Sequence, residues 1–144
     1  MIEIRPPRAS DYAPIRQMLG DASLPVEDFS PEHLAFVASV DGTPVAAIGC
    51  EKLGDVWLLR SLVVAEGQRS RGLGAKLVTA LEADASEQGV GEIWLLTIDA
   101  DGFFGSLGYQ RRERGTAPDT IRGTAEFSDL CPASAVLMSR LVGS

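Results

Sequence analysis

The segment between residues 56 and 98 restricts the fold more than any other part of the chain. An apolar run at 56–64, typical of a strand, precedes apolar residues at helical spacing over 73–85 and a second apolar run at 93–98. Gly89 is expected to end the helix. A strand, a helix and a strand in this order imply a right-handed crossover and therefore a parallel pair of strands. The unbroken apolar character of 93–98 suits a strand that is covered on both faces.

The residues before this segment indicate antiparallel strands. The Asp-Gly-Thr sequence at 41–43 lies between apolar runs at 33–40 and 44–53, and Asp-Gly in such a position is a strong hairpin signal. A second turn at 54–55 leads into the run at 56–64. We therefore predict an α/β (α+β) fold with a mixed, mostly antiparallel central sheet that contains one parallel pair and has helices on both faces.

The two ends of the chain supply the remaining elements. A short strand is stopped by Pro6, and a helix over 10–20 has start signals at Ser10 and Asp11 and is closed by Gly20. The predicted C-terminal elements are a short helix over 101–108, a strand from Tyr109, an irregular polar stretch over 114–132 with helix starts at 116–118 and Thr124, and a last strand over 134–142.

Composition excludes several classes of function. The length of 144 residues fits a single domain, 1–144, and 13 basic against 20 acidic side chains, a net charge of −7, argue against a nucleic-acid binder. Cys50 and Cys131 are too few for a disulfide framework, and His33 has no second histidine with which to build a zinc site. Glu3 and two prolines interrupt the start where a signal peptide needs apolar residues, and no run approaches a membrane span. We expect a cytoplasmic protein without a metal.

The sequence Arg-Ser-Arg-Gly-Leu-Gly at 69–74 is the strongest functional signal. It separates the predicted strand from the predicted helix, whose first N–H groups have no intrahelical partners and attract anions. Gly72 and Gly74 allow the backbone to close around a phosphate, and Arg69 and Arg71 can add charge-assisted hydrogen bonds. The alternatives are an ordinary tight turn for the glycines and a solvated pair for the arginines.

The type of phosphate ligand follows from the rest of the pattern. The lysine-serine pair of a P-loop is absent, and Leu77 stands where the dinucleotide fingerprint needs its third glycine. Arg69, Gly72 and Gly74, preceded by Leu-Val-Val at 62–64, resemble the acyl-CoA motif of the GNAT N-acetyltransferase superfamily and the Leu-x-Val strand before it. The meander, the parallel strand and an aromatic pair before Leu-Gly-Tyr extend the resemblance over nearly the whole chain.

The resemblance implies a GNAT-like three-layer sandwich and an acyltransferase that uses acetyl-CoA as co-substrate. The pyrophosphate would lie on the amides of 69–74, the pantetheine would pair with the backbone of Leu62 and Val64, and the thioester would end near Ser61 and Thr97. Ser61 and Thr97 are therefore candidate catalytic participants. The implied cofactor-binding residues are Leu62, Val63, Val64, Arg69, Ser70, Arg71, Gly72, Leu73, Gly74, Ala75, Phe103, Phe104 and Leu107.

A finer resemblance concerns the acceptor. Residues 59–64, 103–109 and 121–138 look like the acetyltransferase branch associated with arsenic-resistance operons, and the Arg-Ser pair resembles enzymes that acetylate glutamate-like amino acids. Arg60 and Ser61 would there receive the α-carboxylate. The resemblance implies transfer of acetyl to the amine of a free amino acid or an amino-acid-like toxin.

The chain departs from the family pattern at the acid and the base. Many relatives carry a Phe-Tyr pair whose tyrosine protonates the leaving thiolate, but this chain has Phe103-Phe104, and a catalytic glutamate of some relatives corresponds to Arg60. We therefore expect acceleration mainly from positioning and from oxyanion stabilisation by the amide of Val63 or Val64.

Other readings of the acceptor site remain open. Arg60 can instead pair with Glu51 across the meander, and Cys131, close to where relatives bind the acceptor, fits a small structural hydrophobe as well as a substrate contact. The alternative functions are a polyamine or protein N-acetyltransferase and a non-catalytic acyl-CoA-binding sensor. The expected partner is a small-molecule amine, and relatives are often homodimers.

Overall fold

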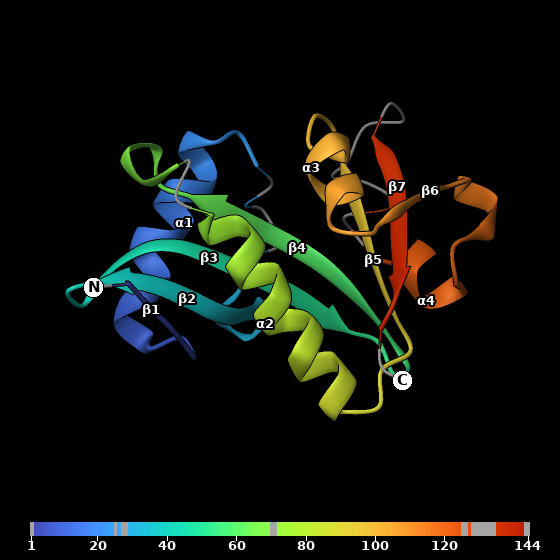
Figure 1. Ribbon diagram of the computed structural model, residues 1–144, viewed down its shortest axis with the longest axis horizontal. Coiled ribbons are helices and arrows are strands. Elements are labelled where there is room, and N and C mark those ends of the chain that lie inside the picture. Colours follow the sequence, from blue (N-terminus) through green and yellow to red (C-terminus); the bar gives the residue numbers. More distant parts are fainter. Residues whose placement is uncertain are drawn as a thin grey trace. The chain divides into compact units, whose positions relative to one another are not determined.

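The computed structural model describes residues 2–24, 26, 29–69, 72–124, 127 and 135–142. The chain forms two compact units, the first made of Met1–Cys50 with Arg60–Asp84 and the second of Glu51–Leu59 with Ala85–Ser144. Seven strands follow the hydrogen-bonded order β1-β2-β3-β4-β5-β7-β6 (Figure 1). The fold is therefore mixed α/β, as the sequence predicts.

The strands are β1 (Ile2–Arg5), β2 (Leu34–Val40), β3 (Thr43–Lys52), β4 (Val56–Val64), β5 (Glu92–Thr97), β6 (Gln110–Arg112) and β7 (Val136–Leu141). The α-helices are α1 (Tyr12–Asp21), α2 (Leu73–Glu87), α3 (Asp101–Ser106) and α4 (Asp119–Arg122). Short 3-10 helices are η1 (Ala9–Asp11), η2 (Pro31–His33), η3 (Glu66–Gln68) and η4 (Arg114–Thr116).

In the first unit, β1 pairs antiparallel with β2 and β2 with β3, so the predicted hairpin of 33–40 and 44–53 is confirmed, and β4, the third predicted strand, lies next to β3. The hairpin between β2 and β3 turns at Asp41 and Gly42, whose φ angles of 51° and 86° are both positive, as a type I′ turn requires. Pro6 follows the last residue of β1, so the predicted end of that strand is confirmed.

The two long helices cover opposite faces of this meander. Ile15 and Leu19 of α1 pack with Val37 and Ala47, which are paired across β2 and β3. Because successive residues of a strand point to opposite faces, the equally buried Ala38, Ala46 and Ile48 project from the other face. Figure 1 shows α1 behind the strands of this unit and α2 in front of them.

Helix α1 does not end where the sequence predicts. Gly20 lies inside the helix, and the chain leaves it through Ser23, which has a φ of 60°. The N–H of Leu24 donates to the carbonyl of Leu19 and that of Ser23 to Gly20, which is the pattern of a Schellman motif. Serine thus occupies the left-handed position that glycine usually fills, and the prediction that Gly20 closes the helix is wrong.

Helix α2 follows its predicted pattern. Its apolar stripe is buried, and the members of the stripe are Leu73, Leu77, Val78, Leu81 and Ala85. Gly89 has a φ of 79°, and the N–H of Val90 donates to the carbonyl of Ala85, so the helix ends in a Schellman motif with glycine at the left-handed position.

In the second unit, β4 and β5 form the parallel pair. Val56 pairs with Glu92 and Leu58 with Trp94, and β5 continues antiparallel to β7, which pairs with β6. The core of this unit, on the face covered by α4, consists of Val56, Leu58, Trp94, Leu96, Ala117, Ile121, Ala135 and Leu137. The four central residues of β5 are all buried, which confirms that this strand is covered on both faces.

The structure contains helices at two of the positions predicted for the C-terminal part of the chain. Helix α4 begins after Pro118 within the stretch expected to be irregular, and α3 falls within 101–108.

None of the helices in the described ranges is long and apolar enough to cross a membrane.

Candidate functional site

The end of β4, the connection to α2 and the first turn of α2 together hold most of the predicted cofactor-binding residues, and this segment belongs to the first unit. The connection begins at Ala65. It is fixed at its start because the N–H of Ala65 donates to the carbonyl of Val45 on β3 (2.7 Å), and the N–H of Gln68 donates to Ala65 (2.9 Å). Arg69 is exposed, and its Nε donates weakly to the carbonyl of Val64 (3.4 Å). The predicted residues Ser70 and Arg71 lie outside the described residues.

Gly72 has a left-handed backbone conformation at the point where this loop meets α2. Its φ is 72°, and its carbonyl accepts the N–H of Lys76 (3.1 Å), so it stands directly before the first turn of α2. Leu73 is buried and anchors the turn, while Gly74 and Ala75 are half-buried. A helix of 15 residues presents free N–H groups and a partial positive charge at this end.

The second half of β4 contains an unusual backbone conformation at Ser61 that the sequence does not predict. Ser61 has a φ of 58° although it lies in a strand, and a non-glycine residue adopts this conformation only where its surroundings enforce it. Arg60 beside it is only 3% exposed, and its Nε donates to Ser61 Oγ (3.3 Å). The predicted carboxylate-binding pair is therefore a buried guanidinium next to a hydroxyl that is held in an unusual backbone geometry.

The three residues that follow Ser61 divide between core and surface. Val63 is buried and packs in the cluster formed with α1, whereas Leu62 and Val64 are half-buried. The side chain of Val63 therefore contributes to stability, and only its backbone is available for the predicted oxyanion role.

The remaining predicted site residues belong to the second unit. The hydroxyl oxygen of Thr97 accepts the N–H of Ala100 (3.0 Å), which fixes the turn from β5 into α3. Phe104 is 5% exposed and meets Tyr109 edge-on at 5.7 Å, while Phe103 is 37% exposed. Leu107 is half-buried, and Cys131 lies outside the described residues. Of the two predicted aromatic residues, Phe104 is a core residue of this unit, whereas the side chain of Phe103 is partly exposed.

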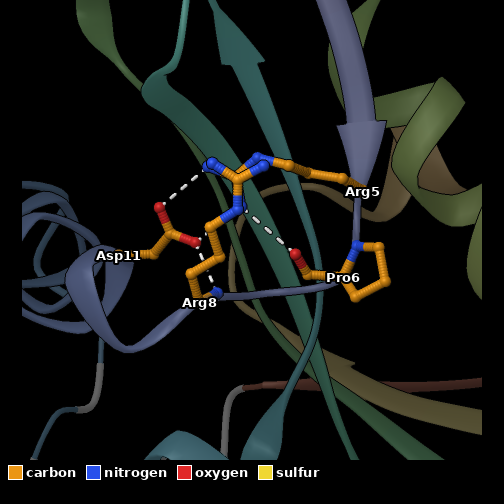
Figure 2. Close-up of polar contacts among 4 residues, drawn as sticks. All are labelled: Arg5, Pro6, Arg8 and Asp11. Atoms are coloured by element: carbon orange, nitrogen blue, oxygen red, sulfur yellow. Dashed lines mark hydrogen bonds and ion pairs between the residues drawn. The ribbon is translucent and has the colours of Figure 1, made fainter.

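A buried ion pair, which the sequence analysis missed, fixes the start of α1. Two guanidinium nitrogens of Arg5 donate to the two carboxylate oxygens of Asp11, at 2.7 and 2.9 Å, and the backbone N–H of Arg8 donates to the same carboxylate at 2.7 Å (Figure 2). Arg5 is 6% exposed and Asp11 2%. The hydrogen bonds from Arg5 hold the pKa of Asp11 below its usual value, and those to Asp11 raise the pKa of Arg5.

No group of three or more histidine, cysteine or acidic residues within the described ranges could hold a metal ion.

Comparison with known proteins identifies the family. Residues 5–109 match the model of the acetyltransferase (GNAT) family, which is more than half of the chain. The chain belongs to this family. The match includes β4, the connection to α2 and both predicted aromatic residues, and it ends at Tyr109.

Individual relatives agree with this assignment. An uncharacterized N-acetyltransferase of Chlorobaculum tepidum is 38% identical over 99 residues, which are 62% of this chain and 59% of that protein. The alignment thus spans less than two thirds of this curated relative.

Solved structures show the same fold. N-acetylglutamate synthase from Neisseria gonorrhoeae, complexed with coenzyme A and N-acetyl-glutamate, has a TM-score of 0.84 at 15% identity and covers 99% of this chain and 35% of its own. A Mycobacterium tuberculosis protein in complex with CoA and NLQ has a TM-score of 0.81 at 20% identity. The match covers 97% of this chain and 99% of that protein. At these identities the similarity establishes the fold.

Proposed function

We propose that this chain is an acetyl-CoA-dependent N-acetyltransferase that acts on the amine of a free amino acid or an amino-acid-like toxin. The observation that carries the proposal is the left-handed backbone of Gly72, directly before a 15-residue helix, in a chain of the GNAT family. A left-handed residue at this position turns the loop so that successive N–H groups can converge on one anion. The diphosphate of coenzyme A is an anion of that kind.

The part of β4 before this loop is suited to the rest of the cofactor. Acetyl-CoA supplies the activated acyl group, and the chain has to hold its arm and stabilise the charge that develops on the thioester oxygen. The backbone of Leu62 and Val64 would bind the arm, and the N–H of Val63 or Val64 would donate to the oxyanion. Because the side chain of Val63 is buried in the core, the backbone N–H groups of Val63 and Val64 are held in place before the reaction begins.

Arg60 supports an amino acid as the acceptor. Its guanidinium is 3% exposed and donates to the hydroxyl of Ser61, and the two oxygens of a carboxylate match the planar fork of such a group. The N-acetylglutamate synthase of similar fold was solved with N-acetyl-glutamate, which is an acetylated amino acid. The resemblance to the arsenic-resistance branch extends the proposed acceptors to arsenical and phosphinic analogues of glutamate.

The acceptor class can be tested by the release of free thiol from acetyl-CoA over a panel of amines. The panel pairs each amino acid with the amine formed by its decarboxylation and adds glutamate analogues, polyamines and peptides with a free N-terminus. We expect kcat/KM for the best amino acid to exceed that of its decarboxylated partner by about tenfold or more, because the carboxylate makes charge-assisted hydrogen bonds.

The other functions give different results in the same panel. Release with polyamines or peptides but not with amino acids contradicts the acceptor class and leaves the acetyltransferase assignment in place. Binding of acetyl-CoA without thiol release from any amine contradicts the enzyme assignment and indicates a sensor.

The role of the loop can be tested by replacing Gly72 with alanine. No heavy atom lies within 4 Å of the position that a Cβ would take, so the effect comes from the φ of 72°, which an alanine adopts at a cost of about 1–2 kcal/mol. We expect the Kd for coenzyme A, measured by calorimetry, to rise about tenfold, because the variant loop must be returned to its binding conformation.

Gly67→Ala in the same loop is the matched control. Gly67 also has open space around the Cβ position but does not have a positive φ, so the Kd should stay at the wild-type value. Equal coenzyme A affinity in Gly72→Ala and Gly67→Ala would show that the conformation of Gly72 has no part in binding.

A further inference from the structure

A surface cavity of about 380 Å³ lies beside α1 in the first unit. The residues that line it are Tyr12, Ala13, Arg16, Gln17 and Gly20 of the helix and Val26 of the segment that follows. None of these residues has a part in the proposed binding of the cofactor or the acceptor. The volume is in the range of sites that hold a small organic molecule. The cavity is therefore a candidate site for a further ligand.

The aromatic wall of the cavity is fixed. The ring of Tyr12 stacks on that of Phe29, with centroids 5.1 Å apart and an angle of 8° between the planes, and the Tyr12 hydroxyl donates to the carbonyl of Phe29 (3.1 Å). Because Phe29 holds both the ring and the hydroxyl, Tyr12 is kept in one orientation. Together with Ala13 and Val26 it offers a preformed surface for an apolar group.

Two polar side chains of α1 line the same cavity. Among the residues that the structure describes, Arg16 has no hydrogen-bond or ion-pair partner, and it is the only charged member of the lining. Gln17 is held in place because its Nε2 donates to Asp21 Oδ1 (3.0 Å), which leaves Gln17 Oε1 as an acceptor. The cavity thus combines a cation that can bind a carboxylate with an oxygen that can accept an N–H.

Gly20 keeps this cavity open. It lies inside α1, where glycine is less favourable than alanine, and it does not have a positive φ. No heavy atom lies within 4 Å of the position that a Cβ would take, so the packing of the protein does not require a glycine either. The absence of a side chain at this position has a reason if the space belongs to a ligand.

We propose that this cavity binds an N-acetylated amino acid with an apolar side chain, a choice of ligand class that rests on the proposed function. The carboxylate would pair with Arg16, the amide N–H would donate to Gln17 Oε1, and the apolar side chain would lie against Tyr12. Acetylation turns the ammonium group of an amino acid into a neutral amide, so the product is an anion. Because Arg16 is the only charge in the lining, it attracts this anion and repels the ammonium group of a free amino acid.

The ligand class can be tested by NMR titration of the full chain without acetyl-CoA. The probe is N-acetyl-L-leucine, and three matched compounds each change one group: L-leucine restores the ammonium, N-acetyl-L-leucine amide lacks the carboxylate, and 4-methylpentanoate lacks the amide. We expect a Kd of about 1 mM for N-acetyl-L-leucine, with shifts concentrated at 12–20 and 26. The Kd should be about tenfold higher for L-leucine and for the amide, and about threefold higher for 4-methylpentanoate.

The contacts can be tested with two variants and a control. Arg16→Gln should bind N-acetyl-L-leucine about tenfold more weakly and no longer distinguish it from N-acetyl-L-leucine amide. Arg8→Gln removes the same charge from another exposed arginine of this unit that does not line the cavity, so its Kd should stay at the wild-type value.

Gly20→Leu should fill the space and raise the Kd by about tenfold or more, while its Tm is not below that of the wild type, because leucine favours a helix more than glycine does. A Gly20→Leu variant that keeps the wild-type Kd would show that the ligand lies elsewhere.

Several results would overturn the assignment of the cavity. These are binding of L-leucine as tight as that of N-acetyl-L-leucine, equal Kd values in the wild type and Arg16→Gln, and shifts concentrated around Arg60 instead of α1. None of them bears on the proposed function, because the titration contains no acetyl-CoA. The absence of thiol release from the wild type with any amine overturns the proposed function and, with it, the identity of the ligand as a product.

Discussion

Asp11→Asn is expected to lower the free energy of unfolding by about 3–5 kcal/mol. The substitution removes the negative charge that faces the guanidinium of Arg5, and both side chains are almost fully buried. An uncompensated cation then remains between β1 and the start of α1, where water does not reach it. Because Asp11 also accepts the N–H of Arg8, the local backbone loses part of its support as well. Urea denaturation of the two proteins at neutral pH measures the difference.

The exposed pair of Asp119 and Arg122 provides the matched control. Their side chains are also joined by an ion pair, at 2.6 Å, but the carboxylate of Asp119 is 93% exposed. Asp119→Asn should therefore change the unfolding free energy by no more than about 1 kcal/mol. Similar losses for Asp11→Asn and Asp119→Asn would contradict the view that burial gives the first pair its effect.

The same pair determines how stability responds to acid. The pKa of Asp11 in the folded protein lies below that in the unfolded chain, so its stabilising contribution is complete above the unfolded pKa of about 3.9. This contribution is lost as the pH falls through the folded pKa. Below about pH 4, the stability of the wild type should therefore fall towards that of Asp11→Asn, which lacks this proton-binding site.

Gly49→Ala is expected to lower the unfolding free energy by about 3 kcal/mol. The added Cβ would stand 2.4 Å from the carbonyl oxygen of His33, and both groups are held by backbone, so neither can move away as a flexible side chain would. The pairing of Leu34 with Gly49 fixes the two strands at this point. The chain must therefore shift β2 or β3 to admit one methyl group.

Gly20→Ala tests the same chemical change without the clash. Gly20 lies in α1 with no heavy atom within 4 Å of the Cβ position, so alanine should stabilise the protein by about 0.5–1 kcal/mol. The two variants are expected to differ in sign in the same thermal or urea denaturation. A small effect of Gly49→Ala would mean that β2 and β3 separate at this point at little cost.

The sequence predicts those parts of the fold that depend on local pattern. The Asp-Gly turn at 41–42, the buried strand β5 and the end of α2 at Gly89 each follow from a few neighbouring residues, and all three are present. The same rules fail at Gly20, which lies inside the helix, three positions before the left-handed residue through which the chain leaves it. Ser23 takes the left-handed position instead.

Contacts between different elements of the fold are the part that pattern does not reveal. Arg5 has no special place in the sequence pattern, Asp11 is visible there only as a helix-start signal, and Gly49 is one position of an apolar strand. Their contacts are seen only when the strands are placed against the helix and the turn. The φ of Ser61 has no signal in composition either, because serine is common in both strands and loops.

The candidate site shows the same division between local and distant information. The loop that ends at Gly72 was predicted from its glycines and from its position between a strand and a helix, both of which are local. His33 and Arg60 are 27 positions apart in the sequence. Their main-chain carbonyl oxygens both approach Gly49 because β2, β3 and β4 are neighbours in the sheet. The sequence pattern alone does not indicate that His33 and Arg60 lie close together.

The edge strand β6 has a consequence for self-association. All three of its residues, Gln110, Arg111 and Arg112, are exposed, and Arg111 pairs with Asp101 at the start of α3. Antiparallel addition of a second β6 would bring the arginines of two copies alongside one another and would have to break or crowd that ion pair. Like charges on an open edge discourage continuous sheets between molecules, so we expect copies of this chain not to polymerise through β6.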